Sequence, residues 1–141
     1  MKNLKILAIM AMVLLTGCQA KSDYDKAMSL IAGLETELMQ CTSYAEYEEV
    51  HERITLVDDN PLMQKKDYSK AEATAIITST GKLIQKALAV KAILRVVPAE
   101  VSPTERDMEK LVNDCMDRKL NYGMPPYREV EELVKAYYNK K

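Results

Sequence analysis

One apolar stripe at helical spacing constrains the fold of this chain more than any other feature. Its members recur every three or four positions: Ala73, Ile76, Thr80, Leu83, Ala87, Val90 and Leu94. This spacing places them on one face of an α-helix, the face that packs against a core. Ser69 and Glu72 have the spacing of a capping box, and Pro98 ends the helical pattern. The stripe therefore predicts one long helix between Ser69 and Pro98.

A second apolar row widens this face through Ile77, Ile84 and Leu88. So wide an apolar arc is expected of a helix at the centre of a bundle, in contact with several others. Leu83 and Ile84 should then both be nearly fully buried, although they are adjacent. Three basic residues interrupt the apolar run too often for a membrane span: Lys86, Lys91 and Arg95.

Shorter stripes predict two helices before the long one. Ser22 is a candidate N-cap for a helix that reaches Cys41. Ser43 and Glu46 have the spacing of a second capping box, and the helix that they open should end before Pro61.

Two further helices are expected after the long one. Ser102-Pro103-Thr104-Glu105 is a third capping-box pattern with proline at the first helical position, and Gly123 is the expected stop. Pro125-Pro126 should start a last helix. The chain shows no alternating strand pattern of useful length. The prediction is an all-α fold, a four- to five-helix bundle that forms a single domain over residues 23–141.

The first 18 residues carry a separate pattern. Lys2 and Lys5 precede an apolar run over 6–15, which leads into Leu15-Thr16-Gly17-Cys18. A basic start and a short apolar core are typical of a secretory signal peptide. About ten apolar residues are well short of the roughly 20 that span a bilayer. We therefore expect export, without a permanent transmembrane helix.

The segment from Leu15 to Cys18 resembles the lipobox of bacterial lipoproteins. The resemblance implies that Cys18 receives a diacylglycerol and that the chain is cut just before it. Residues 1–17 would be the signal peptide, and residues 18–22 the lipidated cysteine and a short tether. Gln19, where an Asp would favour the inner membrane, implies the outer membrane in a Gram-negative cell. The resemblance ends there, and residues 23–141 resemble no particular family.

Length and charge limit the remaining functions. The 124 residues from position 18 onward are enough for one compact domain. The whole chain has a net charge of −1, and its first 17 residues hold two Lys and no acidic residue, so the remainder is near −3. Nucleic-acid-binding domains usually carry a basic face. No nucleic-acid partner is therefore expected.

Two cysteines remain besides Cys18. In an oxidising compartment Cys41 and Cys115 could form a disulfide, which would close a loop of about 74 residues and stabilise the fold by up to roughly 4 kcal/mol. The alternative is two buried thiols, because Cys is among the most buried residue types. A metal site is less suited to this pair, since neither has a neighbouring His.

The polar motifs predict no active site. Glu48 and His51 have the Glu-x-x-His spacing of di-iron bundle sites, but such a site needs two copies and this chain has one His. Thr80-Gly81-Lys82 lacks the earlier glycine and the following hydroxyl of a phosphate-binding loop. We predict no catalytic, metal or cofactor-binding residue, and we do not expect an enzyme.

Two features leave the binding mode open. Hydroxyl side chains in the long helix either bond carbonyls one turn back or line a small polar pocket inside the bundle: Thr74, Thr78, Ser79 and Thr80. The chain has no Phe or Trp, and its eight Tyr either pack at the core edge or form a recognition surface. Tyr137 and Tyr138 are adjacent, so one of them should be exposed.

The expected function is that of a membrane-anchored envelope lipoprotein acting as a non-catalytic interaction module. Its partners would be the membrane, through the lipid on Cys18, and an envelope protein. The alternative is a solute-binding lipoprotein with a small-ligand pocket inside the bundle. A buried pocket above roughly 300 Å³ would favour the solute binder, and a flat apolar patch of roughly several hundred Å² would favour a protein partner.

Overall fold

The computed structural model describes residues 22–139, and this part of the chain is all-helical, as predicted. The expected signal peptide (residues 1–17), Cys18 and all but the last residue of the expected tether lie outside these residues. The five α-helices are α2 (Asp23–Met39), α3 (Tyr44–Thr55), α4 (Lys70–Val96), α5 (Glu105–Asp117) and α6 (Arg128–Asn139). Two short 3₁₀ turns, η1 (Val57–Asp59) and η2 (Pro61–Met63), connect α3 to α4. No helix in the described part combines the length and apolarity needed to cross a bilayer.

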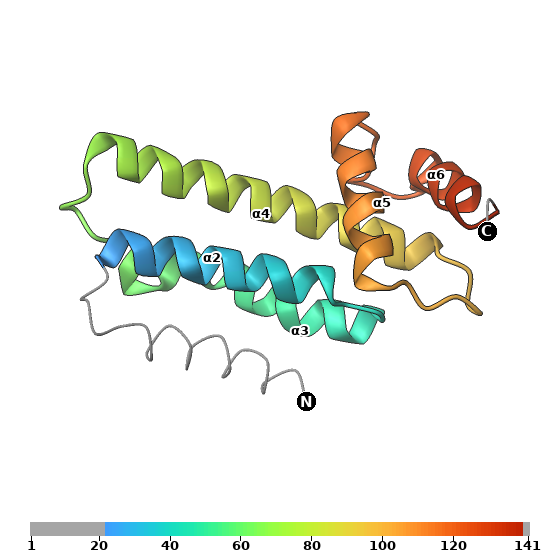
Figure 1. Ribbon diagram of the computed structural model, residues 1–141, viewed down its shortest axis with the longest axis horizontal. Helices are drawn as coiled ribbons and strands as arrows, with labels where there is room; N and C mark the ends of the chain where they lie inside the picture. Colours follow the sequence, from blue (N-terminus) through green and yellow to red (C-terminus); the bar gives the residue numbers. More distant parts are fainter. Residues whose placement is uncertain (1–21, 140–141) are drawn as a thin grey trace.

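The long helix α4 is the element around which the others are arranged. Helices α2 and α3 are antiparallel to each other and lie along one side of α4, as Figure 1 shows. Helix α5 crosses α4 near its C-terminal end, and α6 lies beside that end (Figure 1). All four helices contact α4. The prediction that the long helix is central is confirmed.

Polar residues define the helix starts much as their spacing predicts. Ser22 Oγ accepts the Asp25 N–H at 3.1 Å. At α4 the capping box is complete, since Ser69 Oγ accepts the Glu72 N–H at 3.1 Å and the Glu72 carboxylate accepts the Ser69 N–H at 3.0 Å. The helix therefore begins where the sequence predicted.

The box at α3 is only half formed. Ser43 Oγ accepts the Glu46 N–H at 3.2 Å. The Glu46 carboxylate, however, accepts the N–H of Thr42 at 2.9 Å and the Thr42 hydroxyl at 2.6 Å. Glu46 therefore secures the turn before the cap instead of the cap itself.

The start and end of α5 differ from the prediction. The capping box is formed by Thr104 and Asp107, not by Ser102 and Glu105, and Pro103 is buried outside the helix. At the other end Lys119 takes a left-handed conformation at φ 53°, and the Leu120 N–H bonds the carbonyl of Cys115. The helix thus stops at Asp117, and Gly123 is not the stop.

The last helix starts later than Pro125-Pro126. Tyr127 takes a left-handed φ of 42° and is 9% exposed, and its carbonyl accepts the Glu131 N–H at 2.9 Å. A left-handed conformation is uncommon for an aromatic residue, and the burial of the ring stabilises it here. Helix α6 therefore begins at Arg128.

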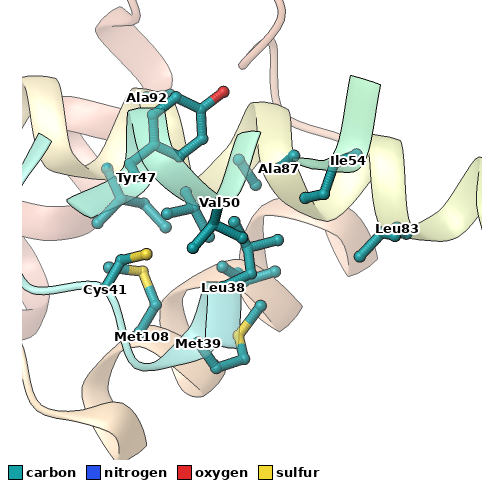
Figure 2. Close-up of a cluster of buried hydrophobic side chains, with 14 of the residues drawn as sticks. Leu38, Met39, Cys41, Tyr47, Val50, Ile54, Leu83, Ala87, Ala92 and Met108 are labelled. Carbon is teal, nitrogen blue, oxygen red and sulfur yellow. The ribbon is translucent and has the colours of Figure 1, made fainter. Parts of the chain in front are cut away.

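One continuous core joins all five helices. Its largest fully buried side chains include Leu38 of α2, Val50 of α3, Leu83 and Ile93 of α4, and Met108 of α5. Figure 2 shows part of this cluster, with Leu38, Val50 and Met108 lying between the ribbons. Three small side chains of α4 are also buried, and they allow the neighbouring helices to approach closely: Ala87, Ala89 and Ala92.

Ion pairs fasten α2 to its neighbours. Arg53 of α3 donates to both carboxylate oxygens of Glu37, at 2.9 and 2.5 Å, and Glu37 is only 6% exposed. Lys86 of α4 pairs with Glu35 on the other flank of α2. The first pair joins the two helices of the α2–α3 hairpin, and the second joins the hairpin to α4.

Cys41 and Cys115, the two cysteines among the described residues, are buried and form no disulfide with each other. Cys41 is 1% exposed and Cys115 is 0% exposed, and Cys115 carries a free thiol. Cys41 follows α2 and shares the cluster of Figure 2 with Met108. Cys115 lies seven residues beyond Met108 on α5, which is roughly 10 Å along a helix. A Cys41–Cys115 disulfide stays a prediction that thiol counting in the unreduced, unfolded protein can decide.

Candidate interaction surface

A second line of residues runs along α4, beside the buried row that contains Leu83. It consists of Thr74, Ile77, Gly81, Ile84 and Leu88, spaced alternately by three and four positions, and we call it the α4 stripe. Alternation of three and four keeps the residues on one side of the helix. The prediction that both apolar rows would be buried is wrong for this one. Ile77 is 72% exposed and Ile84 is 43% exposed, whereas Leu83 is 1% exposed.

Coverage of the stripe changes along the helix. Leu88 is half-buried and Ala92, one turn further, is fully buried, because α5 and α6 pack on this end of α4. Figure 1 shows that the first half of α4 extends away from both helices. The Tyr122 hydroxyl donates to Oε1 of Gln85 at 2.9 Å and marks where the coverage ends. The exposed isoleucines thus occupy the uncovered continuation of a packed line.

Between the side chains of Ile77 and Ile84, the exposed part of the stripe carries only a small residue, Gly81. A Cβ atom at Gly81 would meet nothing within 4 Å, so the surface there is open. Thr74 and Thr78 are exposed and small. Thr78 and Gly81, which lie between Ile77 and Ile84, leave room for a partner's side chain or backbone to come close to α4.

The rim of this surface is basic. Lys70 and Lys82 are exposed and form no ion pair within the described residues, and we call them the basic rim. The only acidic residue of α4 is Glu72, whose carboxylate closes the helix's own capping box. Along α4 the surface therefore offers apolar contact and positive charge, and the one carboxylate of this helix is engaged in its cap.

An open hollow lies beside the stripe but does not enter the bundle. It has a volume of about 740 Å³ and is lined only by residues of α4: Lys70, Ala71, Thr74, Ala75, Thr78 and Ser79. A second hollow, of about 390 Å³, lies against residues of the segment before α6 and its first turn. Neither has the walls on several elements that enclose a small ligand.

One buried hydroxyl does lie inside the bundle without a partner. Thr80 is 8% exposed, and its Oγ1 accepts and donates no hydrogen bond within the described residues. The expected bond to a carbonyl one turn back is therefore not made. Thr80 does not line either of the two hollows.

The residues weighed for catalysis do not form a site in the described part of the chain. The His51 ring stacks on Tyr47 with centroids 5.3 Å apart, and Glu48 is exposed. No group of three or more potential metal-ligating side chains is found among residues 22–139. Gly81 and Lys82 lie in the middle of α4, in helical conformation, where no phosphate-binding loop can form.

A cluster of one carboxylate and two tyrosines, which no sequence pattern indicated, ties α6 to α5. Asp107 is 4% exposed, and it accepts the Tyr137 hydroxyl at 2.5 Å and the Tyr138 hydroxyl at 3.3 Å. The two tyrosine rings stack 5.1 Å apart. Both are therefore partly buried, and the prediction that one would be exposed is wrong. Burial and the nearby carboxylate raise the pKa of Tyr138.

All eight Tyr are buried or half-buried, which agrees with packing at the core edge. The guanidinium group of Arg95 on α4, for example, lies 3.7 Å from the ring centroid of Tyr44 on α3. This cation–π contact joins the two helices. The tyrosines therefore do not form an exposed recognition surface. The exposed large apolar side chains of the described residues are Leu56, Met124, Ile77 and Ile84, and the last two share the α4 stripe.

Comparison with known proteins adds no relative. No protein-family model, no curated protein and no solved structure matches this chain.

Proposed function

We propose that this chain is a lipid-anchored lipoprotein of a bacterial envelope that acts as a non-catalytic interaction module, and that the α4 stripe is its docking surface. The observation that carries the proposal is the exposure of Ile77 and Ile84, at 72% and 43%, on one side of the longest helix. Isolated apolar residues on a surface are ordinary. Two isoleucines seven positions apart, on the continuation of a packed line, are better explained as half of an interface.

The anchor is supported by the sequence alone. A lipid on Cys18 would leave residues 19–22 as the tether, and four extended residues reach at most about 14 Å. A domain held this close to a membrane meets its partners in two dimensions, at a raised effective concentration. A small apolar surface is then sufficient for association.

Mass spectrometry and fractionation test the anchor. The mature chain should begin at Cys18 and carry acyl mass, and Cys18→Ser should leave the protein uncut or release it from membranes. A mature N-terminus elsewhere, without acyl mass, would refute the anchor.

Cross-linking in intact cells tests the docking surface. Met124 supplies a matched control, because it is 71% exposed against 72% for Ile77. We expect the wild-type chain and Met124→Asn to give the same cross-linked complexes, and Ile77→Asn to lose them. Complexes that survive Ile77→Asn would show that the partner binds elsewhere.

Solute binding is a second candidate because of Thr80. A buried hydroxyl without a partner is uncommon, and a polar ligand or a water molecule would satisfy it. This reading requires space beside Thr80, and the stability of a Thr80 variant tests it below.

A further inference from the structure

We infer that the partner of the α4 stripe is an amphipathic α-helix with acidic residues on its flanks. The inference rests on the proposed function and names the chemistry of the partner at the same surface. It depends on three observations: the spacing of the stripe, its continuity with helices already packed on α4, and the charge of its rim.

The spacing fits a helical partner. From Thr74 to Leu88 the stripe alternates three and four positions over 14 residues, which is about 21 Å of helix. This is the a/d spacing through which two helices interlock, with side chains of one filling gaps on the other. Gly81 supplies such a gap between Ile77 and Ile84, because nothing lies within 4 Å of its Cβ position.

Packing on the same line already consists of helices. Helices α5 and α6 cover α4 where the line reaches Leu88 and Ala92, and the contact from Tyr122 to Gln85 marks the end of this coverage. A helix of about four turns that starts at Gln85 and runs toward Lys70 would continue that layer. The partner helix would then cover the first half of α4, including the open hollow, as α5 and α6 cover the second half.

The charge of the rim selects an acidic partner. Lys70 and Lys82 form no ion pair within the described residues, and α4 has no carboxylate available beside them. Glu or Asp on the flanks of the incoming helix would complement them. A second copy of the chain fits less well, because antiparallel pairing centred on Gly81 would bring Lys82 near its own counterpart.

A lipid surface also fits less well than a helix. Helices that lie in a membrane interface usually present a broad apolar face of large residues such as Trp, Phe and Leu. The exposed part of the stripe has two isoleucines separated by Gly81 and bordered by Thr74 and Thr78. Small residues between two anchors are suited to close helix packing instead.

Site-specific photo-cross-linking of the full-length chain, in the cells that make it, tests the inference. The photoreactive residue replaces Thr78, which is exposed beside the stripe, or, as the control, Glu49, an exposed residue of α3. Mass spectrometry then identifies the cross-linked segment. We expect position 78, but not position 49, to capture a segment with apolar residues at three–four spacing and Glu or Asp on its flanks.

Charge variants at Lys82 test the role of the rim. Lys82→Glu should lower the yield of the position-78 adduct at least fivefold, and Lys82→Arg should leave it within twofold. Ile77→Ser, made in the same background, should also lower it at least fivefold. Lys82 and Ile77 are exposed, so these changes leave the core intact.

The outcomes separate the inference from the proposed function. A captured segment without acidic flanks, a captured second copy, or an adduct equally strong in Lys82→Glu would overturn the inference and leave docking at Ile77 standing. Adducts with lipid only, or none above the position-49 control, would overturn both.

Discussion

Arg53 of α3 donates two hydrogen bonds to the Glu37 carboxylate of α2, at 2.9 and 2.5 Å, and the carboxylate is almost fully buried. Arg53→Ala would leave this carboxylate buried without its cation. We expect the free energy of unfolding to fall by about 2–3 kcal/mol, because an unpaired buried charge is costly. Urea denaturation of the lipid-free chain measures it.

The exposed pair Lys135–Glu131, at 2.8 Å, is the control for this prediction. Lys135→Ala should change stability by no more than about 0.5 kcal/mol, since surface ion pairs contribute little. Equal losses for Arg53→Ala and Lys135→Ala would mean that water solvates Glu37 in the folded protein.

Leu83 and Ile84 are adjacent in sequence, but Leu83 lies on the buried side of α4 and Ile84 on the exposed side. Leu83→Ala should cost about 2–5 kcal/mol, the usual range for a buried aliphatic side chain. Ile84→Ala should cost less than about 1 kcal/mol, because the side chain is 43% exposed. Thermal or urea unfolding of both variants decides the matter. A loss at Ile84 as large as at Leu83 would place this face in a packed interface of the isolated protein.

Hydropathy predicted which residues share a face of the long helix but not whether each face has a neighbour. Ile77 and Ile84 are of the same residue type, and have the same spacing, as residues of a core-facing row. They are exposed because α5 and α6 reach only the second half of α4, and this depends on the path of the chain after Pro98. An apolar residue at an interface and one in a core look alike in a sequence.

Helix starts were predictable where one polar pair stood alone, as at Ser69. Near α5 two pairs compete, Ser102 with Glu105 and Thr104 with Asp107, and the sequence does not rank them. The buried interactions of Asp107 with α6 favour the second pair, and these interactions exist only in the tertiary structure. The left-handed residue that ends α5 is Lys119, where the sequence pointed to a glycine.

Thr80 offers a test of the solute-binding alternative. Thr80→Val removes a buried hydroxyl that has no partner within the described residues, so we expect stability to rise by about 1 kcal/mol. Urea denaturation gives the difference. A loss of stability would mean that the hydroxyl is satisfied by water or a ligand, and would favour a polar site inside the bundle.

High pH should destabilise the protein through buried acids. Burial raises the pKa of Tyr47 from 10.0 to about 12 and that of the Cys115 thiol from 9.0 to about 11. Between pH 9 and 12 the unfolded chain therefore binds fewer protons than the native chain, and the free energy of unfolding falls as pH rises.

Urea denaturation between pH 8 and 11.5 measures this slope. Tyr47→Phe removes one of the groups responsible, so its stability should fall less steeply above pH 10 than that of the wild type. Parallel curves for the two proteins would mean that the Tyr47 hydroxyl ionises as readily in the folded state as in the unfolded one.

Carbene footprinting of the wild-type chain tests the central claim, docking at the α4 stripe, without any substitution. Ile77 and Met124 are almost equally exposed in the isolated protein, at 72% and 71%. For each residue, the measured quantity is the ratio of its labelling in intact envelopes to its labelling in the purified protein. We predict that this ratio falls at least threefold for Ile77 and stays near one for Met124. A ratio near one for both residues, or an equal fall for both, would contradict the claim.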